Sequence, residues 1–109
     1  GMELKVDPAS VAWFKEEVGL PQGAGVRFLV KVYGCSPINS GFSLAMETNY
    51  PSDPSVTYQA DGVLFYIESR DEWFFDGHDL SVEFDEGHGE PAYIFVKDGV
   101  AVNPLVKEA

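Results

Sequence analysis

The stretch that decides the fold runs from Gly25 to Glu47 and reads GVRFLVKVYGCSPINSGFSLAME. It contains two segments, 26–33 and 42–46, in which apolar residues recur at every second position. Successive side chains of a strand point to opposite faces, so this alternation predicts two β-strands that each bury one face. The one cysteine of the chain, Cys35, lies in the glycine-flanked loop between them.

Turn signals divide the rest of the chain into further short strands. Asp61-Gly62 joins two alternating segments, which is a strong short-range signal of a β-hairpin. Lys97-Asp98-Gly99 predicts another turn near the C-terminus. Counting the later segments DLSVEF, AYIFV and VAVNP, the sequence predicts about seven short strands.

One helix is predicted ahead of these strands, within VDPASVAWFKEEVGLP. Asp7 is expected to cap it, Pro8 suits its first turn, and Gly19 is expected to take the left-handed closing position. Pro21 then blocks continuation. The apolar stripe that faces the core is expected to consist of Val11, Phe14 and Val18.

A shorter helical turn is predicted within SRDEWFF, because Ser69 followed three residues later by Glu72 forms a capping-box pattern. Aromatic residues crowd the end of this segment. We expect them to pack in the core or at its edge and not to form a ligand cage. These residues are Trp73, Phe74 and Phe75, and the same expectation applies to Trp13 in the predicted N-terminal helix.

Together these elements predict a mainly β (α+β) fold, a compact sandwich or flattened barrel with the helix at one end. With 109 residues, 45% of them hydrophobic, the chain is expected to form one domain spanning residues 2–109.

The charge balance limits the partners. Seven Lys and Arg against eighteen Asp and Glu give a formal net charge of −11, which repels nucleic-acid phosphates and anionic membrane surfaces. We therefore expect no nucleic acid and no membrane as partner. Cations or a basic protein surface are compatible with this charge, as is simple solubility. With no signal peptide or membrane-length apolar run, we expect a cytoplasmic protein.

Candidate chemistry begins with Cys35, which lies between Gly34 and Ser36 at a strand end. In that loop a thiolate can be exposed and supported by backbone N–H groups, while a buried, inert thiol is the competing interpretation. As nucleophile it would need a base, His78 or His88. No signature or orienting third group supports such a pair, so we expect no enzyme.

The segment DGHDLSVEFDEGHGE adds two histidines and several carboxylates around one predicted strand. Imidazole and carboxylate suit zinc, iron or manganese. However, His78 and His88 are ten residues apart, a spacing that does not fix two ligands on one face. We therefore favour the interpretation that both histidines are solvated turn residues. If the chain does bind a metal ion, the candidate ligands are Cys35, His78 and His88.

The order of these segments resembles the HesB-like, or A-type (IscA-like), iron–sulfur cluster biosynthesis family over roughly residues 2–96. That family's Cys-Gly-Cys pair near the C-terminus has no counterpart, since the chain ends AYIFVKDGVAVNPLVKEA. An insertion, 37–40, also separates the two halves of the cysteine motif. The matching residues are Arg27, Gly34, Cys35, Ser36, Gly41, Phe42, Asp61, Gly62 and Gly77.

The resemblance implies the HesB-like fold and one function, and the missing Cys-Gly-Cys pair favours a second. The first is an assembly-related accessory or carrier protein that binds iron or a labile iron–sulfur cluster through Cys35 and works with the iron–sulfur assembly machinery. Clusters usually have four thiolate ligands, and a homodimer of this chain would supply two. The second is a metal-free interaction module that binds a protein partner through its acidic surface or an exposed aromatic patch.

Overall fold

A computed structural model describes residues 2–33, 41–75 and 77–102. Within them, eight strands, one α-helix and one 3₁₀ helix follow one another along the chain. Their bounds are β1 Leu4–Val6, α1 Pro8–Glu17, β2 Gly25–Tyr33, β3 Gly41–Asn49, β4 Pro54–Ala60, β5 Val63–Glu68, η1 Ser69–Phe75, β6 Asp79–Asp85, β7 Glu90–Lys97 and β8 Val100–Val102.

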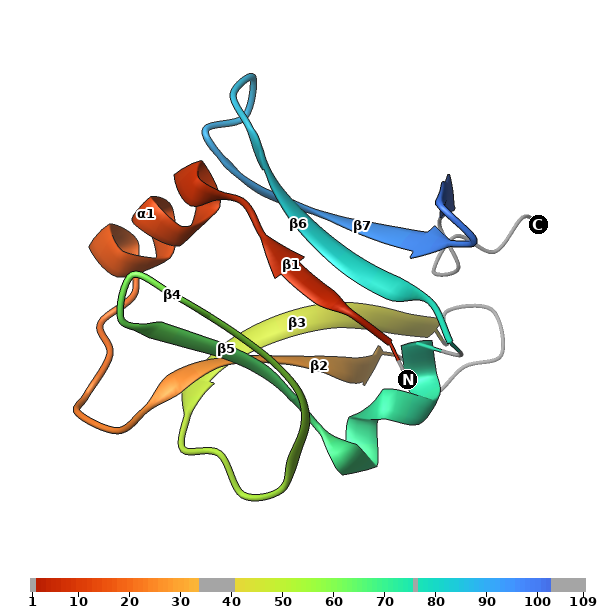
Figure 1. The fold of residues 1–109 in the computed structure, drawn as a ribbon, viewed down its shortest axis with the longest axis horizontal. Coiled ribbons are helices and arrows are strands. Elements are labelled where there is room, and N and C mark those ends of the chain that lie inside the picture. Colours follow the sequence, from red (N-terminus) through yellow and green to blue (C-terminus); the bar gives the residue numbers. More distant parts are fainter. Residues whose placement is uncertain (1, 34–40, 76, 103–109) are drawn as a thin grey trace.

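The described strands form two four-stranded sheets that face each other (Figure 1). One sheet has the order β1-β6-β7-β8 and the other β3-β2-β5-β4. β1 pairs with β6 and β2 with β5 in parallel, while the other neighbours are antiparallel. This confirms the predicted β-rich sandwich with one N-terminal helix. β1 was not predicted, because three residues are too few to show alternation.

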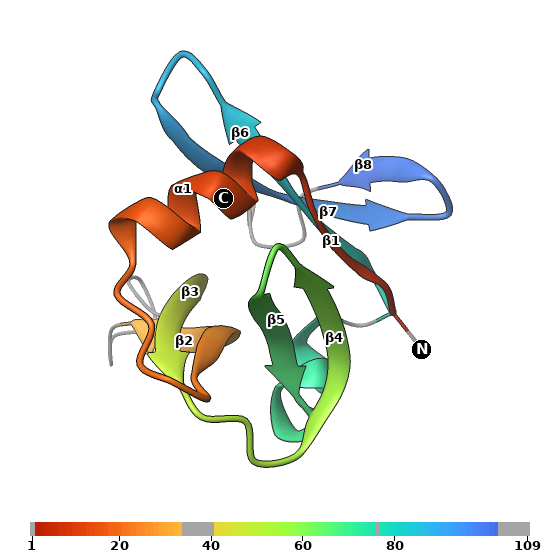
Figure 2. The ribbon, with the colours of Figure 1, turned by 60° about the vertical axis from the view of Figure 1, so that its left-hand side comes forward.

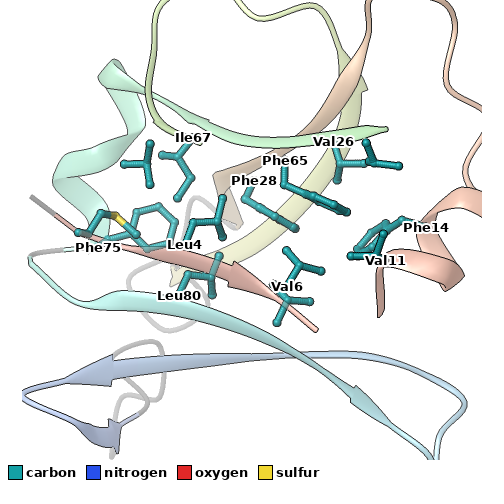
Figure 3. Close-up of a cluster of buried hydrophobic side chains, with 14 of the residues drawn as sticks. Leu4, Val6, Val11, Phe14, Val26, Phe28, Phe65, Ile67, Phe75 and Leu80 are labelled. Atoms are coloured by element: carbon teal, nitrogen blue, oxygen red, sulfur yellow. The ribbon is translucent and has the colours of Figure 1, made fainter. Parts of the chain in front are cut away.

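Aromatic rings fill the space between the sheets (Figure 3). Phe28 on β2 and Phe65 on β5 stack with ring centroids 6.2 Å apart, and Phe14 of α1 meets Phe65 edge-on at 5.3 Å. All three side chains are fully buried, and each large ring removes much apolar surface from water. The aliphatic part of this core includes Leu4, Val6, Val11, Val26, Ile67, Leu80 and Val82.

Helix α1 closes one end of the sandwich. Figure 2 shows it lying between the β6–β7 side of one sheet and the β2–β3 side of the other. Val11 and Phe14 are buried as predicted, and Val18 packs against the same core. The predicted closing role of Gly19 is wrong. Val18 already leaves the helix in an extended conformation while its N–H still donates to the Phe14 carbonyl, so no left-handed residue is needed.

Asp7 is the N-cap of α1, as predicted, and it also ties the helix to the sheet. Its Oδ1 accepts from the Ser10 N–H at 2.8 Å, and its Oδ2 accepts from the Phe84 N–H of β6 at 2.9 Å. Burial works to raise the pKa of this carboxyl, but the hydrogen bonds from Ser10 and Phe84 hold the pKa below its usual value.

At the other end, the predicted helical turn is present as η1, but the predicted capping box does not form. The Ser69 hydroxyl donates to the Asp53 carbonyl, and Glu72 accepts from the Ser55 hydroxyl. Ser69 thus binds the β3–β4 connection, and Glu72 binds the start of β4. The aromatic residues divide: Phe75 is fully buried, Trp13 and Phe74 pack against the core, and Trp73 is exposed, contrary to the prediction.

The two predicted turns are confirmed. Asp61 and Gly62 join β4 to β5, and Asp98 and Gly99 join β7 to β8, with positive φ at all four residues. Among the described helices, none is long and apolar enough to cross a membrane.

Replacing Asp7 tests the helix cap and its second hydrogen bond. We expect Asp7→Ala to lower the free energy of unfolding by about 2 kcal/mol at pH 7, because two N–H groups lose their acceptor. Asp7→Asn should cost less, because one amide oxygen still accepts. Urea unfolding followed by circular dichroism measures both changes.

The difference between wild type and Asp7→Ala should depend on pH. A carboxyl whose folded pKa is lowered stabilises the protein above its unfolded pKa, about 3.9, and loses this effect as the pH falls through the folded pKa. An Asp7→Ala deficit that stays unchanged down to pH 2 would contradict this role.

Candidate functional site

Of the three predicted metal ligands, the structure describes the two histidines. Cys35 lies outside the described residues. His78 and His88 lie beyond opposite ends of β6, a seven-residue strand. At about 3.3 Å per residue such a strand spans roughly 20 Å, far more than two imidazoles on one metal ion can bridge. Within one chain these two histidines therefore do not share an ion.

His78 is held by the chain just before it. Its ring Nδ1 lies 2.7 Å from the Phe75 carbonyl oxygen, and its backbone N–H donates to the same oxygen at 2.8 Å. A carbonyl only accepts, so Nδ1 carries a proton and a neutral His78 keeps Nε2 as its acceptor. The ring thereby helps to close the turn between η1 and β6.

His88 lies in the exposed β6–β7 turn and pairs with Asp85, the last residue of β6. Its Nδ1 is 2.6 Å from Asp85 Oδ2, and its backbone N–H donates to Asp85 Oδ1 at 3.2 Å. The hydrogen bond to Asp85 raises the pKa of His88, and the same bond lowers the pKa of Asp85. With 79% of its side chain exposed, His88 is a solvated turn residue.

Among the described residues, no group of three or more His, Cys, Asp or Glu side chains is placed to hold a metal ion. An open hollow of 520 Å³ lies beside β1, lined by residues that include Lys5, Asp7, Tyr58 and Glu83. A second hollow of 390 Å³ lies between β1 and β4 and shares Lys5 and Tyr58 with the first. Their linings contain no histidine.

A buried ion-pair cluster lies on the outer face of the second sheet. Val26 and Phe28 point into the core, so Arg27 between them points outward. Its Nη1 is 3.1 Å from Glu47 Oε1 on β3, and its Nη2 is 2.7 Å from Asp71 Oδ2 on η1. Only 8% of the Arg27 side chain is exposed. The guanidinium thus joins the sheet to η1.

Burial and neighbouring carboxylates shift the pKa values of Arg27 and of the tyrosine beside it. Burial disfavours the charge of Arg27, but the hydrogen bond and charge of Asp71, together with the charges of Glu47 and Glu68, raise the pKa of Arg27 above its usual value. Tyr66, the cross-strand neighbour of Arg27, is also buried. Burial raises the pKa of Tyr66, and the charge of Glu68 raises it further. The Arg27 Nε and the Tyr66 hydroxyl have no hydrogen-bond partner among the described residues.

Glu68 extends this cluster to the β3–β4 connection. Its carboxylate is buried at the end of β5 and accepts the backbone N–H groups of Ser52 and Asp53, at 3.1 Å and 3.0 Å. The Ser69 N–H then donates to the Asp53 carbonyl at 2.9 Å. The 50–53 connection and η1 are therefore held together as one unit by charges on β2 and β5.

Sequence reasoning identified Arg27 only through the family resemblance and missed Glu68 and Asp71. Both acids belong to a chain rich in exposed carboxylates, so their residue type carried no signal. One local signal existed: Glu68 ends the apolar run VLFYI, where a charge is expected to be buried or paired.

Removing each acid partner of Arg27 should have unequal effects. Asp71 is 17% exposed and Glu47 is 38% exposed, so losing Asp71 leaves a poorly hydrated guanidinium. We expect Asp71→Ala to lower the free energy of unfolding by about 3 kcal/mol and Glu47→Ala by less than about 1 kcal/mol. Equal losses in urea unfolding would show that Asp71 has no special role.

Comparison with solved structures supports the fold. The crystal structure of Escherichia coli SufA, a protein involved in the biosynthesis of iron–sulfur clusters, superposes with a TM-score of 0.56 and 23% sequence identity. The match covers 85% of this chain and 78% of SufA. At this identity the likeness establishes a shared fold, which agrees with the HesB-like fold expected from the sequence.

Comparison of sequences gives a closer relationship, although no family model matches the chain. An uncharacterised protein of Staphylococcus saprophyticus is 34% identical over 95 residues, covering 84% of this chain and 97% of that protein. The Bacillus subtilis protein named pyruvate dehydrogenase inhibitor is 41% identical over 92 residues, again covering 84% of this chain and 97% of the relative. The chain therefore belongs to the family of the Bacillus subtilis pyruvate dehydrogenase inhibitor.

Proposed function

We propose that this chain binds a pyruvate dehydrogenase and inhibits it, acting as an interaction protein and not as an enzyme. The observation that carries this proposal is the 41% identity to the Bacillus subtilis pyruvate dehydrogenase inhibitor, which extends over 97% of that relative. The relative has no large segment that this chain lacks. The proposal is the more specific form of the interaction module expected as one alternative from the sequence.

Two physical features support a binding role. The net charge of −11 favours association with a basic surface, because opposite potentials accelerate encounter and orient the partners. The two sheets and the polar cluster around Arg27 form a rigid scaffold, so little conformational freedom is lost on binding. A rigid acidic module of this kind inhibits by occupying a surface of the enzyme.

The proposal predicts saturable inhibition of a purified Bacillus pyruvate dehydrogenase complex, measured as pyruvate-dependent NADH formation. We expect activity to fall as the chain is added and to level off at a fixed ratio of chain to enzyme. Raising the salt concentration from 50 to 300 mM should weaken the inhibition, because screening reduces the attraction between opposite charges.

Escherichia coli SufA is a suitable control, because it has a similar fold and lies far from this family in sequence. It should leave the enzyme active at the same concentrations. Full enzyme activity in a tenfold excess of this chain at 50 mM salt would refute the proposed function.

A second candidate function keeps iron or a labile iron–sulfur cluster as cargo. It is favoured by the Gly34-Cys35-Ser36 motif together with the SufA-like fold. The donors fit a resident cluster poorly: the chain has one thiol, and the two histidines lie at opposite ends of β6. Cargo held through Cys35 would need ligands from a second copy, from an external thiol such as glutathione, or from a partner in the assembly machinery.

Anaerobic reconstitution with iron, sulfide and glutathione tests this second candidate. It predicts a visible chromophore, with iron and sulfide retained after desalting, that Cys35→Ala abolishes. Cys35→Ser should abolish the chromophore as well. It is the matched variant, because it keeps the size of the side chain and removes only the soft thiolate ligand. If wild type and both variants retain equal amounts of metal, or none, the candidate is rejected.

A further inference from the structure

Among the described residues, Trp73 in η1 is the largest apolar side chain exposed to solvent, with 66% of its surface accessible. In Figure 1, η1 is the short coil that follows β5, at the end of the sandwich opposite α1. Tryptophan is strongly enriched among the residues that dominate protein interfaces, because one side chain buries a large, rigid surface. An exposed tryptophan in a chain proposed to bind an enzyme is therefore a candidate anchor.

A ladder of aromatic rings supports the Trp73 side chain from below. Its indole packs edge-on against Phe74 with centroids 6.0 Å apart, and Phe74 packs edge-on against Phe75 at 5.7 Å. Phe75 is fully buried and stacks on Phe95 of β7 at 5.7 Å. Figure 3 shows Phe75 at one end of the core cluster. The ladder connects the exposed indole directly to the core.

The backbone that carries Trp73 is fixed as well. Asp71, two residues earlier, accepts from Arg27 at 2.7 Å, and Glu72 accepts from the Ser55 hydroxyl at 2.9 Å. Ser69 at the start of η1 binds the Asp53 carbonyl. A side chain held in place before binding loses little freedom when a partner covers it, so it contributes more to affinity than a mobile one.

From this arrangement we infer that Trp73 is the docking anchor of the chain and that it inserts into an apolar pocket, rimmed by basic residues, on the surface of pyruvate dehydrogenase. The inference rests on the proposed function and specifies which surface carries it. The basic rim follows from charge, since Glu72 adjoins Trp73 and Asp53 adjoins η1 on a chain of net charge −11, and the exposed Arg70 of η1 offsets only one of these acids.

The other large exposed apolar side chains among the described residues are weaker anchors. Tyr50, 57% exposed, lies against Gly23 and carries a hydroxyl that water solvates well. Val100 and Val102 on β8 offer much less surface each. Val100 is 62% exposed, almost the same fraction as Trp73, but it belongs to the other sheet. It therefore provides a matched control.

The test compares wild type, Trp73→Ala, Trp73→Phe and Val100→Ala as inhibitors of the purified pyruvate dehydrogenase complex. We expect Trp73→Ala to raise the half-inhibitory concentration about 30-fold or more. Trp73→Phe should raise it less, because a phenyl ring fills part of the pocket. Val100→Ala should stay within about twofold of wild type, as surface substitutions outside an interface do.

Thermal unfolding of each variant separates loss of docking from loss of folding. Trp73 is mostly exposed, so its variants should melt close to wild type; if Trp73→Ala melts early, Trp73→Phe alone decides. Wild-type-like inhibition by Trp73→Ala, or by Trp73→Phe in that case, would overturn the inference and leave the proposed function standing. An equal loss in Val100→Ala would also overturn it. If wild type itself does not inhibit, the proposed function and the inference fail together.

Discussion

The paired charge of Arg27 is the constraint on which the outer face of the second sheet depends. An arginine so little exposed is tolerated only when carboxylates compensate for its lost hydration, and here one partner comes from β3 and the other from η1. Satisfying one side chain thus fixes the position of a segment distant in sequence. Glu68 does the same for the β3–β4 connection through two backbone N–H groups. The polar cluster holds in place segments that apolar burial alone would leave loosely fixed.

Much of the fold could be predicted because the local signals agree with the tertiary structure. Asp7 caps its helix, the two Asp-Gly turns have positive φ, and a strand, β2, forms where apolar residues alternate in the sequence. Burial along β2 does not alternate, because the ion pairs of Arg27 allow it to be buried between Val26 and Phe28. β1 was missed because it has three residues and obtains its stability from pairing with β6. The site was less predictable. Whether the Glu72 side chain binds the start of its own helix or Ser55 depends on how close β4 packs to η1, which no local sequence pattern encodes.

The comparisons separate scaffold from function. This chain shares its fold with SufA at 23% sequence identity and has a single cysteine. Its sequence is more similar to that of a pyruvate dehydrogenase inhibitor, at 41% identity. Core and turn residues maintain the fold, so the residues of a functional site can change while the fold stays the same. The resemblance read from the sequence therefore identified the architecture correctly, and the function has to be argued from the surface.

The ladder between β2 and β3 has a consequence for how such a protein can diversify. Nine consecutive residue pairs run from Gly25 opposite Asn49 to Tyr33 opposite Gly41 without a shift of register. The ladder therefore places Tyr33 opposite Gly41, the two residues that flank positions 34–40. Lengthening a connection closed in this way costs little, since the entropy of closure grows only with the logarithm of its length. Evolution can insert or delete residues around Cys35 without disturbing the sheet, which makes this part of the chain a natural place for relatives to differ.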